Sequence, residues 1–196
     1  IPLMILDRPN PLTGKIKQGQ KAEMTYKSFI NFYPIKTRYG LTIGELAKKS
    51  IKKNWVKSNI ELTVIKTKHW KKNQWFDQTN LKWIPPSPNI PNIQTALLYS
   101  GMNIFEATNV SEGRGTSSPF LMIGAPWING AKLANELNRM HLKGIKITAS
   151  TFIPKAIEGK VTNPKYNNQR CEGIKIDIIN RKKINAPEIA ELILKS

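Results

Sequence analysis

We predict an α/β fold class for this sequence, with a layered, mixed β-sheet and flanking helices. Two kinds of segment alternate along the chain. Some alternate apolar and polar residues, as half-buried strands do, and others repeat apolar residues at helical spacing. The clearest strand pattern is Ile174, Ile176 and Ile178, and the clearest helix start is a capping box of Thr42 and Glu45. Strands and helices that alternate in this way pack as layers around one core.

The first half of the chain contains a strand, a helix and a second strand. Residues 2–6 are an apolar strand that ends before Pro9 and Pro11, because proline fixes φ and lacks the N–H that a strand needs. A helix near residues 42–53 follows the capping box. Residues 60–64 alternate apolar and polar side chains, which predicts a half-buried strand.

The second half begins with a loop that proline makes stiff. Four prolines within residues 84–91 predict an extended conformation there. After it we predict a short helix over residues 92–99, a longer helix around 131–141 and a strand around 145–147. The last helix carries Pro187 in its first turn, a position that tolerates proline.

The composition is that of a globular protein with an excess of positive charge. The 196 residues include 31 Lys and Arg against 13 Asp and Glu, a formal net charge of +18. Nucleic-acid sites favour arginine for its planar fork, whereas this chain spreads 25 lysines and only 6 arginines along its length. With 26 isoleucines and 18 asparagines, the pattern indicates an AT-rich genome. We therefore do not expect nucleic acid as a partner, whereas an acidic sugar polymer gains modestly from the charge.

We expect no cofactor, no bound metal and no membrane span. The single Cys171 excludes an internal disulfide, and His69 and His141 lie too far apart for a familiar ligand spacing. No apolar run approaches the roughly 20 residues that a membrane helix needs. The apolar start at Ile1 lacks the basic region and cleavage site of a signal peptide. Because a core-like strand begins at once, we expect the native chain to be longer.

The densest group of polar side chains lies in residues 105–116, which we define as the site loop. It contains Glu106, Asn109, Glu112 and Arg114, with a glycine on each side of the arginine that lets backbone approach a ligand closely. Loops on rigid scaffolds are where binding and catalytic residues concentrate. The alternative is a local salt bridge that only fixes the shape of the loop, although surface ion pairs stabilise little.

The site loop is one of five stretches that resemble a known family. In chain order they are LDRPNPL at 6–12, GLTIGELA at 40–47, WIPPSPN at 83–89, FEATNVSEGRGT at 105–116, and GAPW at 124–127. These motifs, in this order and at this approximate spacing, resemble the exo-β-N-acetylmuramidase family. Members of that family remove terminal N-acetylmuramic acid from cell-wall sugar chains. The chain departs from the usual pattern at Ala107, where glycine is common, and at Tyr39, where histidine is common.

The resemblance implies a two-domain protein about twice this length that begins with a Rossmann-like domain. It implies that this chain is the carboxy-terminal half only. Residues 1–14 are then the end of the preceding domain, and residues 15–196 are the carboxy-terminal α/β domain. The favoured catalytic glutamate of the family lies in a Glu-His motif of the first domain, and no Glu-His pair occurs in this chain.

The function implied is that of the substrate-binding half of a glycoside hydrolase. Its ligand is a muramic-acid-containing saccharide, its partner is the absent amino-terminal domain, and the family favours a periplasmic or other extracytoplasmic location. The alternative is a non-catalytic cell-wall sugar-binding module, or a domain remnant without a known function.

Glycoside hydrolysis uses two carboxyl groups on opposite sides of the scissile bond. If the absent domain supplies one, Glu112 and, after it, Glu106 are the candidates for the second; the other possible role of Glu112 is to orient Arg114. Arg114 suits the lactyl carboxylate of muramic acid, because a guanidinium binds a carboxylate through two parallel hydrogen bonds. Asn109 is a further candidate for substrate binding.

Four more candidates for substrate binding lie outside the site loop. Arg8 and Asn10 follow the end of the first strand, where α/β proteins often place residues that face a ligand. Asn89 can offer its amide to the N-acetyl group, and Trp127, like Trp83, can stack on a sugar face. The alternatives are a turn-stabilising pair for Arg8 and Asn10, an Asx-turn for Asn89, and core positions for the tryptophans.

Overall fold

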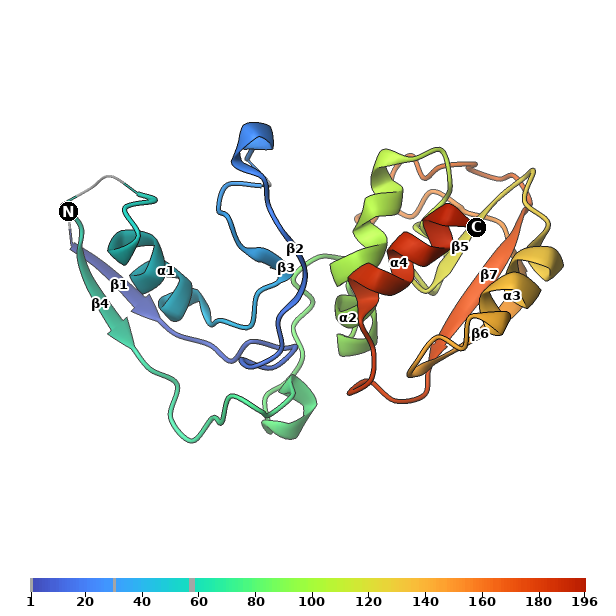
Figure 1. The fold of residues 1–196 in the computed structure, drawn as a ribbon. Coiled ribbons are helices and arrows are strands. Elements are labelled where there is room, and N and C mark those ends of the chain that lie inside the picture. The colour runs from blue at the N-terminus through green and yellow to red at the C-terminus, as the bar shows by residue number, and fades with distance from the viewer. Residues whose placement is uncertain (1, 30, 57–58) are drawn as a thin grey trace. The chain divides into compact units, whose positions relative to one another are not determined.

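The computed structural model describes residues 2–29, 31–56 and 59–196, and the chain divides into two compact units (Figure 1). The first unit is Ile1–Trp83 and the second is Ile84–Ser196. Each unit has its own strands and helices, so the two are described separately.

The first unit is built from short elements. In chain order they are β1 (Pro2–Leu6), β2 (Gln18–Lys21), η1 (Met24–Tyr26), β3 (Lys36–Arg38), α1 (Ile43–Lys52), β4 (Glu61–Ile65) and η2 (Phe76–Gln78). Strand β1 pairs in parallel with β4, and α1 packs against both strands. Strands β2 and β3 form a separate antiparallel pair.

A carboxylate joins the end of β1 to the start of α1. Asp7 accepts hydrogen bonds from the hydroxyl of Thr42 at 2.6 Å and from the N–H of Gly44 at 2.9 Å. The predicted capping box is also present, because the Thr42 hydroxyl accepts from the Glu45 N–H and the Glu45 carboxylate accepts from the Thr42 N–H. The carboxylates of Asp7 and Glu45 thus lie at the N-terminus of α1, where the helix dipole is positive.

A buried arginine occupies the interior of the first unit. Arg38 donates to the side-chain oxygen of Gln18 at 2.9 Å and to the backbone oxygen of Leu12, and its guanidinium lies 5.1 Å from the ring centroid of Trp75. Burial lowers the pKa of Arg38 to about 10. The Arg38 side chain thus links β2, the turn at Leu12 and Trp75 inside this unit.

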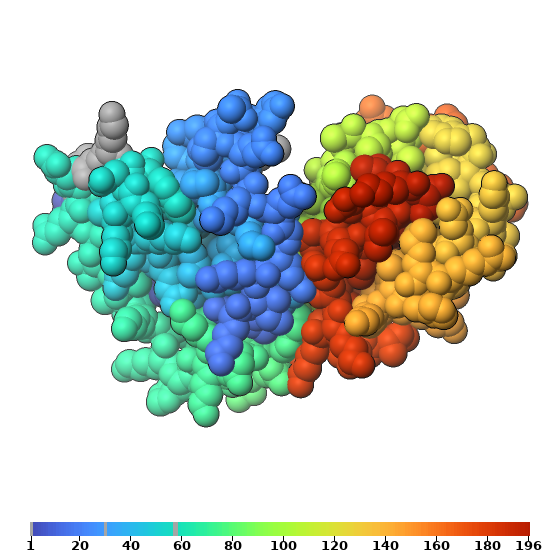
Figure 2. Space-filling model, in the orientation of Figure 1, coloured from blue at the N-terminus to red at the C-terminus, as the bar shows by residue number. Residues whose placement is uncertain are grey.

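The second unit contains a three-stranded antiparallel sheet and three α-helices. Its elements are α2 (Ile93–Met102), η3 (Asn103–Ala107), β5 (Met122–Ala125), α3 (Gly130–Arg139), β6 (Ile145–Phe152), β7 (Cys171–Ile178) and α4 (Ala186–Lys195). The strand order is β5-β7-β6. Helix α3 packs on β6 and β7, and α2 packs on α4. In Figure 2 the red residues of α4 lie at the surface of this unit, beside the orange residues of α3.

Glycines allow the elements of the second unit to approach closely. A Cβ at Gly101 of α2 would lie 2.1 Å from the backbone oxygen of Ala186, at the start of α4. A Cβ at Gly130, the first residue of α3, would lie 2.4 Å from the backbone oxygen of Gly173 in β7. The apolar core lies between the helices and the sheet, where Ile174 is fully buried. The start of α3 is thus fixed against the sheet.

The structure is mixed α/β as predicted, but the expectation of one layered sheet is wrong. The described strands form two separate pairs and one three-stranded sheet. Alternation of side chains predicts which face of a strand is buried, but it does not predict which strand lies beside it. Strands β2, β3 and β5 were not predicted, because they are short and β5 buries all four of its residues without alternation.

The strand at 2–6, the helix near 42–53 and the strand at 60–64 are present within a residue or two of their predicted bounds, and the last helix, α4, has Pro187 in its first turn as predicted. The helices predicted at 92–99 and 131–141 are α2 and α3, and β6 extends well beyond 145–147. Across the described ranges, no helix has both the length and the apolar character that crossing a membrane requires.

Candidate functional site

The site loop, residues 105–116, is fastened to the sheet of the second unit. It begins in the short helix η3, and Ser111 pairs with Gly124 of β5 through two backbone hydrogen bonds of 2.8 and 3.1 Å. Gly113 and Gly115 have φ angles of +78° and +83°, a left-handed conformation that side chains strongly disfavour. Between these two glycines the chain turns and presents Arg114.

Arg114 brings together the three charged residues that the sequence singles out. Its Nη2 is paired with Oε1 of Glu106, and its Nε lies 3.9 Å from Oε1 of Glu112. Its guanidinium also lies 5.2 Å from the ring centroid of Phe120. The side chains of Arg114 and Glu106 are 33% and 34% exposed, whereas that of Glu112 is only 5% exposed. Solvent therefore reaches the Arg114–Glu106 pair, and Glu112 lies beneath it.

Lys165 contacts the site loop through its ammonium group, and the sequence analysis did not identify it. Its Nζ donates to the backbone oxygens of Phe105 at 2.6 Å and Val110 at 3.1 Å. The same atom lies 3.0 Å from Oε2 of Glu112, at ion-pair distance but without hydrogen-bond alignment. A buried carboxylate is costly unless a charge compensates it. Lys165 thus makes the burial of Glu112 possible, and nothing in the local sequence distinguishes it from the other lysines.

Tyr99 of α2 adds a phenol to the charged cluster. Its ring meets that of Phe120 edge to face, with centroids 4.8 Å apart. Burial raises the pKa of Tyr99, the charge of Glu106 raises it further, and the charge of Arg114 lowers it. The Tyr99 hydroxyl therefore stays protonated at neutral pH and can donate a hydrogen bond.

Asn109 and Trp127 are linked through Tyr166. The Tyr166 hydroxyl donates to the backbone oxygen of Asn109, and its ring meets the indole of Trp127 edge to face, with centroids 5.4 Å apart and planes at 84°. Trp127 remains 58% exposed, so it is not the core residue that the alternative interpretation expected. Sequence reasoning missed Tyr166, which is 57 residues from Asn109 in the chain.

The other three candidates lie outside the site loop. In the first unit, the amide of Asn10 donates to the Leu41 backbone oxygen at 2.8 Å, its oxygen accepts from the Leu12 N–H at 2.9 Å, and Arg8 is exposed. In the second unit, the Asn89 amide donates to the backbone oxygen of Lys160 at 2.9 Å. These bonds stabilise turns and loops, so a ligand-binding role for the three residues stays a prediction.

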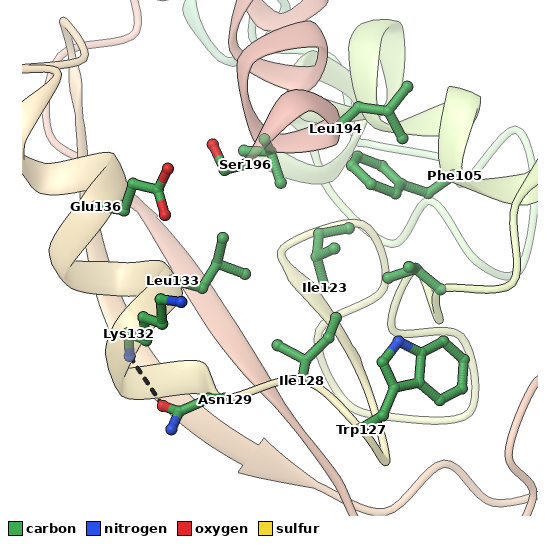
Figure 3. A pocket seen from close by; sticks show the side chains of 12 residues that line it. Phe105, Ile123, Trp127, Ile128, Asn129, Lys132, Leu133, Glu136, Leu194 and Ser196 are labelled. Carbon is green, nitrogen blue, oxygen red and sulfur yellow. Dashed lines mark hydrogen bonds between the residues drawn. The ribbon is translucent and has the colours of Figure 1, made fainter.

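Beside the site loop the second unit has a cavity of about 430 Å³ (Figure 3). Phe105 and Val110 of the loop line it, together with Ile123 of β5, Leu133 of α3 and Trp127. The loop therefore has a charged part at Arg114 and an apolar part that faces a cavity. No group of three or more His, Cys, Asp or Glu that could hold a metal occurs among the described residues.

Two family models match the chain one after the other. The model described as "Exo-beta-N-acetylmuramidase NamZ, N-terminal" matches residues 1–94, and the corresponding C-terminal model matches residues 97–196. This chain belongs to the NamZ exo-β-N-acetylmuramidase family. The expectation that it represents the carboxy-terminal half only is wrong, because residues 1–94 match the amino-terminal model and residues 1–83 form a compact unit of their own. The division after residue 14 stays a prediction.

Relatives in the NamZ family are longer than this chain. The peptidoglycan beta-N-acetylmuramidase NamZ of Bacillus subtilis (strain 168) is 39% identical over 196 residues, which are 100% of this chain and 45% of that protein. A crystal structure of a DUF1343 family protein from Bacteroides fragilis NCTC 9343 superposes with a TM-score of 0.90 at 33% identity, over 98% of this chain and 48% of that one. A second such protein gives 0.70 at 32% identity, over 96% and 46%. The chain thus spans less than half the length of these relatives.

Proposed function

We propose that this chain supplies the sugar-acid-binding part of a glycoside hydrolase that releases terminal N-acetylmuramic acid from peptidoglycan fragments. The observation that carries the proposal is the partly exposed side chain of Arg114, which the site loop holds between two carboxylates. Membership of the NamZ family and the name of the Bacillus subtilis relative support a muramidase role.

Arg114 binds the lactyl carboxylate of N-acetylmuramic acid in this proposal. Two cations, Arg114 and Lys165, face two anions, Glu106 and Glu112, so the cluster is neutral before a ligand arrives. A ligand carboxylate that accepts two hydrogen bonds from the Arg114 guanidinium displaces Glu106. The ion pair of Arg114 with Glu106 is the weaker one, because solvent screens it. Binding of the acid therefore releases the carboxylate of Glu106 beside the sugar.

Of the two predicted catalytic carboxylates, we place Glu106 against the substrate. A general acid or base must come within hydrogen-bond reach of the atom it serves, and Glu106 is accessible whereas Glu112 is not. Glu112 then acts as a positioning residue that orients Arg114 and pairs with Lys165. The tyrosine hydroxyl of Tyr99 is a further donor to the bound sugar acid. Asn109, Arg8, Asn10, Asn89 and Trp127 are proposed as supporting contacts.

The test compares two ligands that differ only in the lactyl group, N-acetylmuramic acid and N-acetylglucosamine. Both are titrated into the chain, and binding is followed by NMR chemical shifts. Arg114→Ala should weaken binding of N-acetylmuramic acid by at least about tenfold, because hydrogen bonds to charged groups contribute roughly 1.5–3 kcal/mol. It should leave binding of N-acetylglucosamine unchanged. Arg114→Lys should lose part of the preference, because lysine keeps the charge but not the planar fork.

Arg139→Ala, an exposed arginine of α3, is the matched control and should change neither affinity. If Arg114→Ala weakens both ligands equally, Arg114 does not recognise the carboxylate and the proposal fails. The chain alone should not hydrolyse a chromogenic muramic-acid glycoside, because it offers one accessible carboxylate in the loop where two are needed.

The burial of Glu112 also favours a second candidate, a non-catalytic cell-wall sugar-binding module. Such a module would show the same preference for the acidic sugar. The two candidates differ in a fusion experiment. If the chain is only a binding module, fusing it to the remaining part of a longer relative should produce no hydrolysis. Hydrolysis by the joined protein, and its loss with Glu106→Gln, would identify the chain as part of an enzyme.

A further inference from the structure

The segment that connects β2 to β3 in the first unit exposes a group of apolar side chains. Every residue from 23 to 29 is exposed. In Figure 1 the blue coil of η1 lies at the far end of the β2–β3 pair. Exposed apolar side chains that gather in one segment mark a surface that meets a protein or a membrane. We define the apolar tip as Met24, Tyr26, Phe29 and Phe32, of which Phe29 is 98% exposed.

Backbone hydrogen bonds give the apolar tip a defined shape. Ser28 and Asn31 exchange two of them, at 3.3 and 3.2 Å. The Nζ atom of Lys27 lies 4.1 Å from the ring centroid of Phe32. These contacts shape the segment but leave the ring of Phe29 in water, where an apolar group of this size costs free energy.

The apolar tip belongs to the more basic of the two units. The first unit contains 17 Lys and Arg against 5 Asp and Glu, and the second contains 14 against 8. Lys21 and Lys36 face each other in the register of β2 and β3, at the base of the tip, and Lys27 lies within it. Glu23 is the one acidic residue in the sequence from 18 to 38. An apolar end above a basic base suits a surface that is anionic outside and apolar inside.

We propose that the apolar tip docks on the surface of an anionic phospholipid membrane. Phe29 and Met24 enter the boundary between headgroups and acyl chains, while Lys21, Lys27 and Lys36 lie among the anionic headgroups. Lysine suits this position, because its long apolar stem can lie along the lipid while the ammonium stays in water. The attachment is peripheral and needs no membrane-spanning helix. It goes beyond the proposed function, since it concerns where the chain is held and involves no residue of the Arg114 cluster.

The test sediments the chain with two kinds of vesicle. One contains equal parts of phosphatidylglycerol and phosphatidylcholine, and the other contains phosphatidylcholine alone. The chain should bind the anionic vesicles and leave the neutral ones, and high salt should weaken this binding. Phe29→Ser should weaken it by about tenfold, because one phenyl ring is no longer transferred out of water. Lys27→Gln should weaken it by about fivefold, because one cation near the anionic surface is lost.

Matched controls change exposed residues of the second unit. Ile179→Ser removes an exposed apolar side chain there, Lys182→Gln removes an exposed lysine, and neither should alter binding. Phe29→Trp should keep the affinity, and vesicles of brominated phosphatidylglycerol should quench its fluorescence more than that of the parent chain. Thermal unfolding of each variant shows whether it is folded.

Three outcomes with the chain itself overturn the inference. They are no binding to anionic vesicles, equal binding by Phe29→Ser and the parent chain, and equal binding to neutral vesicles. A fourth test addresses the other possible occupant of the tip, the part of the longer relatives that this chain does not span. A fusion of the chain to that part should still bind anionic vesicles through Phe29. Loss of binding in the fusion would show that the added part covers the tip, and the inference would fail.

Discussion

The two units of the chain are stabilised in different ways. Among the apolar side chains that are buried in the described residues, only Pro9 and Trp75 belong to the first unit, and all the others lie at or beyond residue 97. In the first unit Leu3, Met4 and Leu6 of β1 are 44%, 64% and 64% exposed. The second unit therefore has a closed hydrophobic core, whereas the first depends on the polar contacts of Asp7 and Arg38.

This difference explains where the candidate site lies. A site loop must hold Arg114 and Glu106 in one geometry, and a scaffold whose core is closed does that best. The first unit has the opposite character, because a parallel sheet normally has both faces covered and two strands alone are marginal. Its apolar strand β1 exposes side chains that other parallel sheets bury.

The largest effect is expected when the two units are produced as separate fragments. Residues 84–196 alone should fold, with dispersed amide signals and a cooperative thermal transition, because their core is internal. Residues 1–83 alone should show neither, since little apolar area is buried there. Circular dichroism and NMR spectra of the two fragments provide the measurement. A cooperative transition in residues 1–83 would show that polar contacts suffice to fold that unit.

The elements that were predicted from the sequence are those whose signals are local. The capping box of Thr42 and Glu45 and the alternation of Ile174, Ile176 and Ile178 each lie within a few residues, and both are present in the structure. The composition of the site loop also singled out Glu106, Glu112 and Arg114, and these side chains lie together in the structure. What escaped prediction depends on contacts between distant residues.

Lys165 illustrates that limit. It contacts Phe105, Val110 and Glu112 from 53 to 60 residues away, and its three neighbours have no pattern in common with it. The sequence analysis ranked Glu112 before Glu106 as the candidate carboxylate, whereas the side chain of Glu112 is only 5% exposed in the structure. The pairing of strands into three small sheets is likewise a long-range property that periodicity does not encode.

The second prediction concerns the ion pair of Lys165 with the buried Glu112 in the second unit. Lys165→Met should destabilise the second unit by about 2 kcal/mol, less than the roughly 3–5 kcal/mol for a fully buried pair, because Lys165 is partly exposed. Glu112→Gln in the same chain should recover much of the loss, since no buried charge is then left uncompensated. Lys143→Met, at an exposed position, is the control and should cost less than about 0.5 kcal/mol.

Urea unfolding of the four proteins measures the coupling between the two residues. Equal losses for Lys165→Met with and without Glu112→Gln would mean that Lys165 acts only through the backbone oxygens of Phe105 and Val110. The first unit offers a contrast. Among the residues that the structure describes, no cation pairs with the Asp7 carboxylate, which accepts hydrogen bonds at the positive end of α1 instead.

The smallest expected effect is a pH dependence that belongs to the second unit. Burial raises the pKa of Tyr99 above its usual value of 10, so the folded state holds the phenol proton more tightly than the unfolded state does. The stability that this proton confers is complete below pH 10 and is lost as the pH rises through the pKa of the folded state. Tyr99→Phe should therefore flatten the alkaline decline of the second unit, measured as the urea midpoint between pH 8 and 11. Because Glu106 also raises this pKa, Glu106→Gln should make the decline smaller and end it at a lower pH, while its onset near pH 10 stays the same. An unchanged profile in both variants would place Tyr99 outside the charged cluster.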